Sequence, residues 1–164
     1  MKKKRILFGI LLTLSIVMTG ICGSYTASAE AERETFTKKN VVVLDPGHGG
    51  ADSGSYEVHK GHVYNESVIN WKIACYTMEE LKKYPDIEVY MTRTKNQNKG
   101  LVSRVLTAKS YGADLLVSQH VNSTESRYVK GASVLISKGT YRSYLAEKEK
   151  LFGKCVIKEL TRLG

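Results

Sequence analysis

Cysteine is scarce in this chain of 164 residues, which contains only three. None of them forms a Cys-x-x-Cys pair, and this argues against a zinc site built from thiolates. Cys75 and Cys155 both fall on the apolar stripe of a predicted helix, a position typical of small buried side chains. A disulfide between them would need an oxidising compartment, and the sequence leaves that pairing open.

Motifs for two common classes of ligand are also missing. The glycine-rich segment 47–52 lacks the third glycine of a dinucleotide-binding fingerprint, and no Gly-Lys-Ser/Thr follows it. After residue 29 there is no lysine- and arginine-rich run interleaved with aromatic residues, so the positive charge does not indicate nucleic-acid binding. Internal repeats and low-complexity linkers are lacking as well, so we expect residues 41–164 to form one domain.

The first 29 residues have the pattern of a secretory signal peptide. Residues 1–5 are basic, residues 6–21 are apolar with small polar interruptions, and Ala-Ser-Ala at 27–29 matches the signal peptidase site. The apolar run is also long enough to serve as a retained membrane anchor. The cleavage site favours removal, and we therefore predict a secreted, extracellular protein.

Removal of this leader would leave a moderately basic protein. The leader holds four Lys or Arg residues and no acidic residue, so its loss lowers the formal net charge from +9 to +5. Such a charge suits an anionic surface, for example a bacterial wall. We expect a monomer without stable membrane insertion, with residues 30–40 as a flexible lead-in to the domain.

Apolar periodicity predicts that strands and helices alternate after residue 40. The predicted strands are 41–45, 87–91, 115–117 and 132–137, and the predicted helices start near Asn65, Leu101 and Arg142. Between the first strand and the first helix we expect a long loop, 46–63. The predicted inward residues are Val68, Trp71, Cys75 and Met78, then Leu101, Val105 and Ala108, then Leu145, Phe152, Val156 and Leu160. This order favours an α/β fold, with an open, mostly parallel twisted sheet and helices on both faces.

Two histidines follow two of the predicted strands. His48 comes after strand 41–45 and a Pro-Gly turn, and His120 comes after strand 115–117. The carboxyl ends of parallel strands meet at one edge of a sheet, where open α/β folds place their ligands. Glu66 lies in the first turn of the following helix. Two imidazoles and one carboxylate can form a catalytic zinc site, whereas His48 taken alone would be an ordinary turn residue.

Several separated blocks of the sequence resemble the zinc-dependent N-acetylmuramoyl-L-alanine amidases of the bacterial cell wall, of the Amidase_3 type. The matching residues are Leu44-Asp45-Pro46-Gly47-His48-Gly49-Gly50 with Asp52 and Gly54, Asn65-Glu66 with Asn70 and Ala74, Val89-Tyr90-Met91-Thr92-Arg93, Leu101 with Arg104 and Ala108, Ala113-Asp114-Leu115, and Ser118-Gln119-His120-Val121-Asn122. The blocks occur in the family's order and cover most of residues 41–164.

The resemblance implies a specific metal site and reaction. His48, Glu66 and His120 would bind one Zn²⁺ per chain. The protein would hydrolyse the amide between the lactyl group of N-acetylmuramic acid and the L-alanine of the stem peptide. Its partner would be peptidoglycan, and its location the cell wall.

One residue of the family pattern is not found in this sequence. The family's proton-handling glutamate lies on a strand beyond the last helix, and the sequence ends on that helix at Gly164. We therefore expect the general base beyond Gly164, no catalytic residue within these 164 residues, and zinc binding with little or no turnover. The alternative is a non-catalytic wall-binding or regulatory relative that keeps the fold.

Six other polar residues are weaker candidates for a role in binding. His59 and His62 flank the same loop and could be extra ligands, but exposed loop histidines are the simpler interpretation. Arg93 and Arg104 could contact an anionic substrate or tie loops together through hydrogen bonds. Glu57 and Glu125 lie in loops near the presumed site, and we expect both to be solvated.

Overall fold

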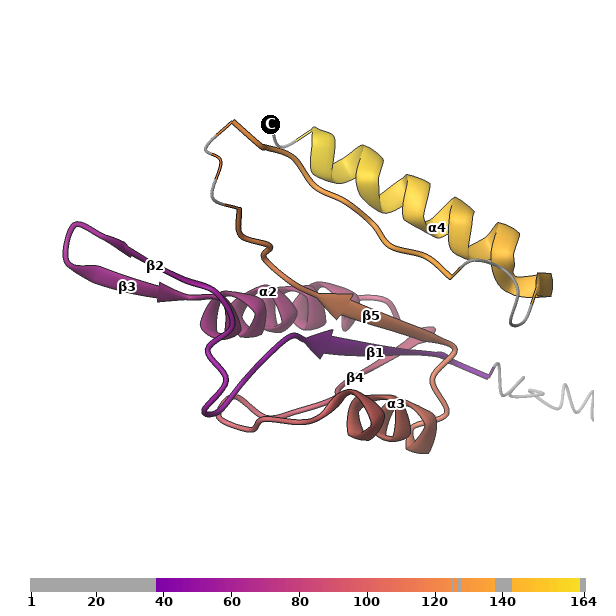
Figure 1. Ribbon diagram of the computed structural model, residues 1–164. Helices are drawn as coiled ribbons and strands as arrows, with labels where there is room; N and C mark the ends of the chain where they lie inside the picture. Colours follow the sequence, from indigo (N-terminus) through magenta and orange to yellow (C-terminus); the bar gives the residue numbers. More distant parts are fainter. Residues whose placement is uncertain (1–37, 125, 127, 138–142, 163–164) are drawn as a thin grey trace, which may run out of the picture. The chain divides into compact units, whose positions relative to one another are not determined.

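Strand β1 (Asn40–Pro46) is the central strand of a three-stranded sheet in which every pairing is parallel. β4 (Ile87–Met91) pairs with one edge of β1 and β5 (Leu115–Gln119) with the other. Figure 1 shows the three strands with β1 between the other two. The register places Val43 beside Tyr90 on one side and beside Leu116 on the other. The three consecutive valines at 41–43 suit this central position because β-branched side chains pack well on a pleated surface.

The structure is a computed structural model that describes residues 38–124, 126, 128–137 and 143–162. Its remaining elements are β2 (Tyr56–His59), β3 (His62–Asn65), α2 (Glu66–Leu81), α3 (Leu101–Ser110) and α4 (Ser143–Thr161). The predicted signal peptide lies outside the described residues and stays a prediction. Within the described ranges, no helix is both long enough and apolar enough to cross a membrane.

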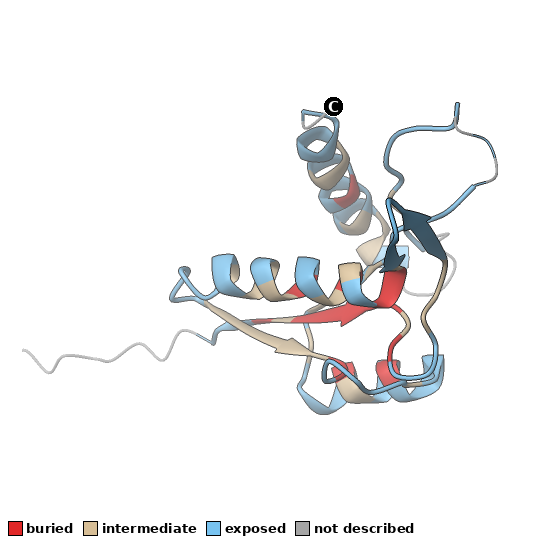
Figure 2. Cartoon of the chain, turned by 90° about the vertical axis from the view of Figure 1, so that its left-hand side faces the viewer, coloured by how far each residue is buried: buried red, intermediate tan, exposed pale blue. Residues whose placement is uncertain are grey.

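Helices α2 and α3 cover opposite faces of the sheet, as Figure 2 shows. Side chains of a strand alternate between faces, so the odd-numbered residues of β1 point toward α3. Val41 and Val43 are buried there against Ala108. Leu44 belongs to the opposite face and is 1% exposed. The predicted α/β fold with a parallel sheet and helices on both faces is therefore confirmed.

The segment predicted as a long loop contains an antiparallel hairpin, so that prediction was incomplete. β2 and β3 pair from Tyr56 with Asn65 to His59 with His62. Lys60 and Gly61 connect them with φ angles of 49° and 80°. Two consecutive residues with positive φ are typical of a type I′ turn, which fits the twist of a two-residue hairpin.

The predicted strand 132–137 is wrong, since these residues join no sheet in the structure. They run along α4 instead (Figure 1). Val134 and Ile136 lie 3.3 Å from the position of a Cβ on Gly153, the buried residue of α4. The Ser137 amide also donates a hydrogen bond to Glu149. Apolar contacts with a helix thus replace the strand pairing that the apolar pattern suggested.

The buried faces of the helices differ from the predicted ones. α2 buries Glu66, Ser67, Asn70 and Ala74, and α3 buries Arg104 and Ala108. Of the residues predicted to point inward, Ala108 is buried, but Val68, Leu101, Val105, Phe152 and Leu160 are exposed. Cys75 is half-buried, Cys155 is exposed, and both are free thiols. Polar residues of α2 and α3 therefore occupy the inward positions beside the edge of the sheet where His48 and His120 lie.

Candidate metal centre

The turn after β1 brings the backbone very close to the two histidines. His48 has a φ of 58°, a left-handed conformation that is uncommon for a residue with a side chain. A Cβ on Gly47 would overlap the ring of His120, so only glycine fits at this position. A Cβ on Gly54 would lie 2.6 Å from the His48 ring. These glycines therefore allow both imidazoles to approach one point.

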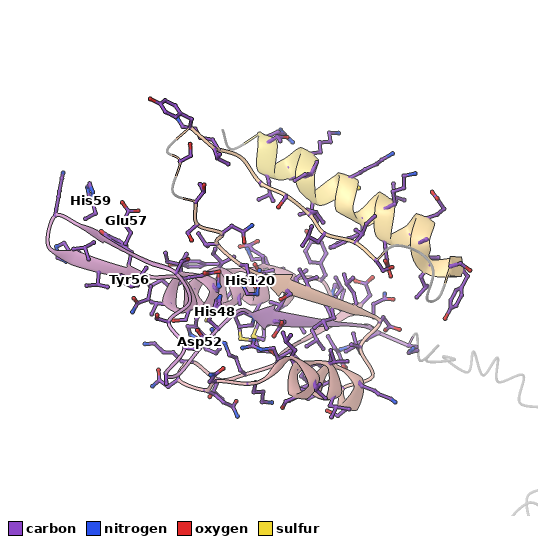
Figure 3. The ribbon with its side chains drawn as sticks, viewed as in Figure 1. His48, Asp52, Tyr56, Glu57, His59 and His120 are labelled. Atoms are coloured by element: carbon purple, nitrogen blue, oxygen red, sulfur yellow. The ribbon has the colours of Figure 1, made fainter. Side chains whose placement is uncertain are left out.

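His48, Glu66 and His120 come together at the carboxyl end of the sheet. One donor atom from each of the three residues lies within 4.8 Å of the other two. His48 Nε2 is 3.3 Å from one carboxylate oxygen of Glu66, and His120 Nδ1 is 3.1 Å from the other. The two imidazole rings meet edge to face with their centroids 5.0 Å apart, and Figure 3 shows them side by side. These are the three residues that the sequence predicts as zinc ligands, and the place where their donor atoms meet is the candidate metal site.

Glu66 is held on both of its oxygens by the protein. Oε2 accepts hydrogen bonds from the amide and the hydroxyl of Ser55, at 3.1 and 2.7 Å, and Oε1 accepts one from the amide of Val121 at 3.1 Å. Burial opposes ionisation, but the bonds from Ser55 and His120, together with the charge of His48, lower the pKa of Glu66 from its usual 4.5 to about 2. The side chain is therefore an anion at neutral pH.

Asp52 orients His48. Its Oδ2 lies 3.0 Å from His48 Nδ1, and its Oδ1 accepts a hydrogen bond from the Gly54 amide. The bond from Gly54 and that from His48 lower the pKa of Asp52, so its ionised carboxylate can only accept. His48 Nδ1 must then carry the proton, which leaves Nε2 facing Glu66. A carboxylate behind an imidazole is the usual way in which proteins fix a metal-binding histidine.

Two buried arginines hold the turn that carries His48. Arg104 donates to the carbonyls of Pro46 and His48 at 2.9 and 2.8 Å. Arg93 donates to the carbonyls of Pro46 and Gly47 at 2.7 and 3.0 Å. Both side chains are almost fully buried. Of the two readings of these arginines, the structure supports the one in which they tie loops together.

Asp45 supplies the negative charge for this arrangement. It forms a 2.8 Å ion pair with Arg104 and also accepts hydrogen bonds from Thr92 and Ser118. Burial opposes its ionisation, yet the hydrogen bonds and the charge of Arg104 lower the pKa of Asp45. Strands β1, β4 and β5 each contribute to this buried network or lead directly into it, so the sheet edge is tied together beneath the metal site.

The other candidate residues lie elsewhere. Glu57 and His59 project from the exposed hairpin, away from His48 and His120 (Figure 3), and His62 is exposed on β3. Glu125 lies outside the described residues. Sequence reasoning missed the supporting roles of Ser55 and Ser118, because a lone serine in a loop or at a strand end carries no pattern that marks it.

A cavity of about 360 Å³ opens beside the metal site. Its lining includes His48, His120, Asp52, Ser118 and Arg104. The cavity is thus polar at the sheet edge, where the three donor atoms meet. A ligand bound there would contact the metal site from the side of α3.

We predict that Gly47→Ala will weaken metal binding by roughly 10–100-fold, the range typical when the support of a metal ligand is disturbed. The added Cβ would displace the His120 ring. Gly61→Ala is the control, because a Cβ there meets no atom, while its φ of 80° makes alanine unfavourable for a reason unrelated to the histidines. Both variants should lose stability, but only the first should lose zinc affinity in a chelator competition. Equal affinities for the two variants would contradict the prediction.

Comparison with known proteins places this geometry in a family. Residues 42–163 match the model of the Amidase_3 family, described as N-acetylmuramoyl-L-alanine amidase. The chain is 38% identical over 114 residues to N-acetylmuramoyl-L-alanine amidase AmiC of Escherichia coli O6:H1, which covers 66% of this chain and 27% of the relative. It is 34% identical over 116 residues to AmiA of Escherichia coli K12, which covers 68% of this chain and 39% of the relative. The chain therefore spans well under half the length of these two relatives.

Solved structures give the same result. The N-acetylmuramoyl-L-alanine amidase from Clostridium difficile 630 superimposes with a TM-score of 0.53 at 30% identity, covering 66% of this chain and 59% of that one. The catalytic domain of CwlV from Bacillus (Paenibacillus) polymyxa superimposes with a TM-score of 0.52 at 35% identity, covering 56% of this chain and 50% of that one. This chain belongs to the Amidase_3 family of N-acetylmuramoyl-L-alanine amidases.

Proposed function

We propose that this protein takes part in zinc-dependent hydrolysis of the amide between N-acetylmuramic acid and L-alanine in peptidoglycan. The observation that carries the proposal is the convergence of His48, Glu66 and His120 within 4.8 Å at the carboxyl end of a parallel sheet. Family membership supports the choice of bond, because the matching family model and the relatives bear the name of that activity.

The donor set fits Zn²⁺. Zinc accepts imidazole nitrogen and carboxylate oxygen, and catalytic zinc sites keep three protein ligands with a further position open. Glu66 is ionised, and Asp52 directs one nitrogen of His48 toward it. Hard cations such as Mg²⁺ prefer oxygen ligands, so two imidazoles argue against them.

The residues of this chain would position the substrate and the ion. When bound, zinc supplies a Lewis acid that polarises the scissile carbonyl and lowers the pKa of a bound water to about 7. His48, Glu66 and His120 would hold it, and the hydrogen bonds to Asp52 and Ser55 would keep two of these ligands in place. The adjoining cavity would receive the amide that is cleaved.

A general base is the remaining requirement. Among the described residues that line the cavity or the metal site, each carboxylate is already engaged, Glu66 with the histidines, Asp45 with Arg104 and Asp52 with His48. We therefore propose, in line with the sequence prediction, that the base is a glutamate supplied from beyond Gly164. A positioned base typically contributes 10²–10⁴-fold to the rate.

The predicted setting is the cell wall. A signal peptide at residues 1–29 would direct the protein out of the cell, and the net charge of +5 that remains after its removal would favour an anionic polymer. We propose peptidoglycan as the partner and an extracellular, wall-associated location on this basis.

The test is amide hydrolysis of purified peptidoglycan by the zinc-loaded chain. We expect zinc binding at one ion per chain with little or no release of stem peptide. Fusion of a C-terminal segment taken from a relative such as AmiC should restore release, and His120→Ala in that fusion should abolish it. Efficient hydrolysis by the unextended chain would contradict the proposed position of the base. A fusion that binds zinc and peptidoglycan without cleaving would favour the wall-binding alternative.

A further inference from the structure

Ser55 makes two contacts with one oxygen of Glu66. Its amide donates to Oε2 at 3.1 Å and its hydroxyl donates to the same atom at 2.7 Å. The Glu66 amide returns a hydrogen bond of 2.9 Å to the Ser55 carbonyl. Hydrogen bonds to an ionised acceptor are shorter and stronger than those between neutral groups. Ser55 thus forms hydrogen bonds with both the side chain and the backbone of Glu66, the predicted ligand.

The same oxygen faces one of the two predicted histidine ligands. Oε2 lies 3.3 Å from His48 Nε2, whereas the other oxygen faces His120 and the Val121 amide. Glu66 is 6% exposed, so water is largely excluded from replacing a lost donor. The serine hydroxyl therefore helps to decide the rotamer of Glu66 and the direction in which Oε2 points.

We propose that the Ser55 hydroxyl is a positioning group that sets the zinc affinity of this site by fixing Glu66. The inference rests on the proposed function, because it assumes that His48, Glu66 and His120 bind zinc. Ser55 itself has no role as a ligand, and its effect is exerted through Glu66 alone. Groups that orient metal ligands typically change metal affinity 10–100-fold when they are removed.

The contact lies at the base of the hairpin. Ser55 directly precedes β2 and Glu66 directly follows β3, and the first pair of the hairpin is Tyr56 with Asn65. The bonds between Ser55 and Glu66 therefore continue the hairpin pairing by one further step. This position explains why a small polar residue in a loop can reach a ligand eleven positions away in the sequence.

The test is Ser55→Ala in the full chain, read as zinc affinity by chelator competition and as the visible absorption of the cobalt-substituted protein. We expect affinity to fall about tenfold, because the amide contact survives while the hydroxyl is lost. The cobalt bands should shift, since they report the ligand geometry. Ser55→Thr keeps a hydroxyl and should recover most of the affinity and the original bands.

Ser53→Ala is the matched control. Ser53 lies in the same loop, but its hydroxyl donates to the neighbouring Gly54 carbonyl and not to Glu66. Its zinc affinity and cobalt spectrum should match those of the unmodified chain. If Ser55→Ala agrees with Ser53→Ala in both measurements, the inference is overturned while the metal site stands. If the unmodified chain binds no zinc, the proposed function is contradicted, and the inference about Ser55 falls with it.

Discussion

Glu66→Gln should lower zinc affinity by about 10³-fold. Zinc bound by a complete set of protein ligands is held with roughly 10–16 kcal/mol of apparent free energy, so each ligand accounts for several kcal/mol, and 1.4 kcal/mol is a factor of ten. Glutamine has nearly the same shape as glutamate but carries no charge. Its amide nitrogen would also face either the Ser55 donors or the Val121 amide, which now bond to the two oxygens.

Glu57→Gln is the control for this prediction. It makes the same chemical change on the exposed strand β2. The Glu57 side chain points away from His48 and His120 (Figure 3). Its zinc affinity should equal that of the unmodified chain. Circular dichroism of the metal-free proteins checks that both variants are folded. A Glu66→Gln protein that binds zinc within tenfold of the unmodified chain would show that Glu66 is not a ligand.

The convergence of His48, Glu66 and His120 could be predicted from the sequence because strand ends and a helix start are visible in it. A run of β-branched residues followed by Pro-Gly locates His48, and a second apolar run locates His120. Parallel strands then bring both residues to the same edge. The residues that hold these side chains in place were harder to predict, because Ser55 and Asp52 act through local hydrogen bonds that leave no periodic signal in the sequence.

The buried faces of α2 and α3 were also predicted incorrectly from the apolar pattern. Apolar spacing predicted Val68 and Val105 as inward residues, whereas the structure buries Asn70 and Arg104. In α2 the buried residues lie beside the predicted stripe, and in α3 the buried and predicted sets share only Ala108. Hydrophobicity marks the face of a helix that covers an apolar core, but near the site the helices must present donors to carbonyls and carboxylates. Hydrophobic patterns therefore fail at the residues that support function.

The hairpin β2–β3 and the segment 132–137 show that the pairing partner of a segment was harder to predict than its tendency to be extended. Val134 and Ile136 have the composition of a strand, but they pack on α4. The hairpin strands are exposed and short, with Lys-Gly at the turn in place of the more familiar Asn-Gly. Pairing depends on which partner lies nearby, and that is set by the whole fold.

Arg104→Met should destabilise the domain by about 3–5 kcal/mol, the usual effect of removing one partner of a buried ion pair. Asp45 would keep a buried charge without Arg104, and the carbonyls of Lys99 and His48 would each lose a donor. Methionine fills a similar volume, so the loss reflects the missing hydrogen bonds and charge. Urea unfolding of the metal-free protein at neutral pH measures the effect.

The pH dependence of the same variant separates charge from packing. Arg104 helps to lower the pKa of Asp45 from its usual 3.8, so the pair contributes stability above that pH and loses it as the pH falls through the lowered value. The stability difference between the unmodified chain and Arg104→Met should therefore shrink at acidic pH. Lys109→Met, an exposed change on the same helix, should stay within about 0.5 kcal/mol at every pH. Arg104→Lys should fall between the two, because one ammonium cannot reach every acceptor of the guanidinium. If Arg104→Met were as stable as Lys109→Met, the buried pair would not be what holds the His48 turn.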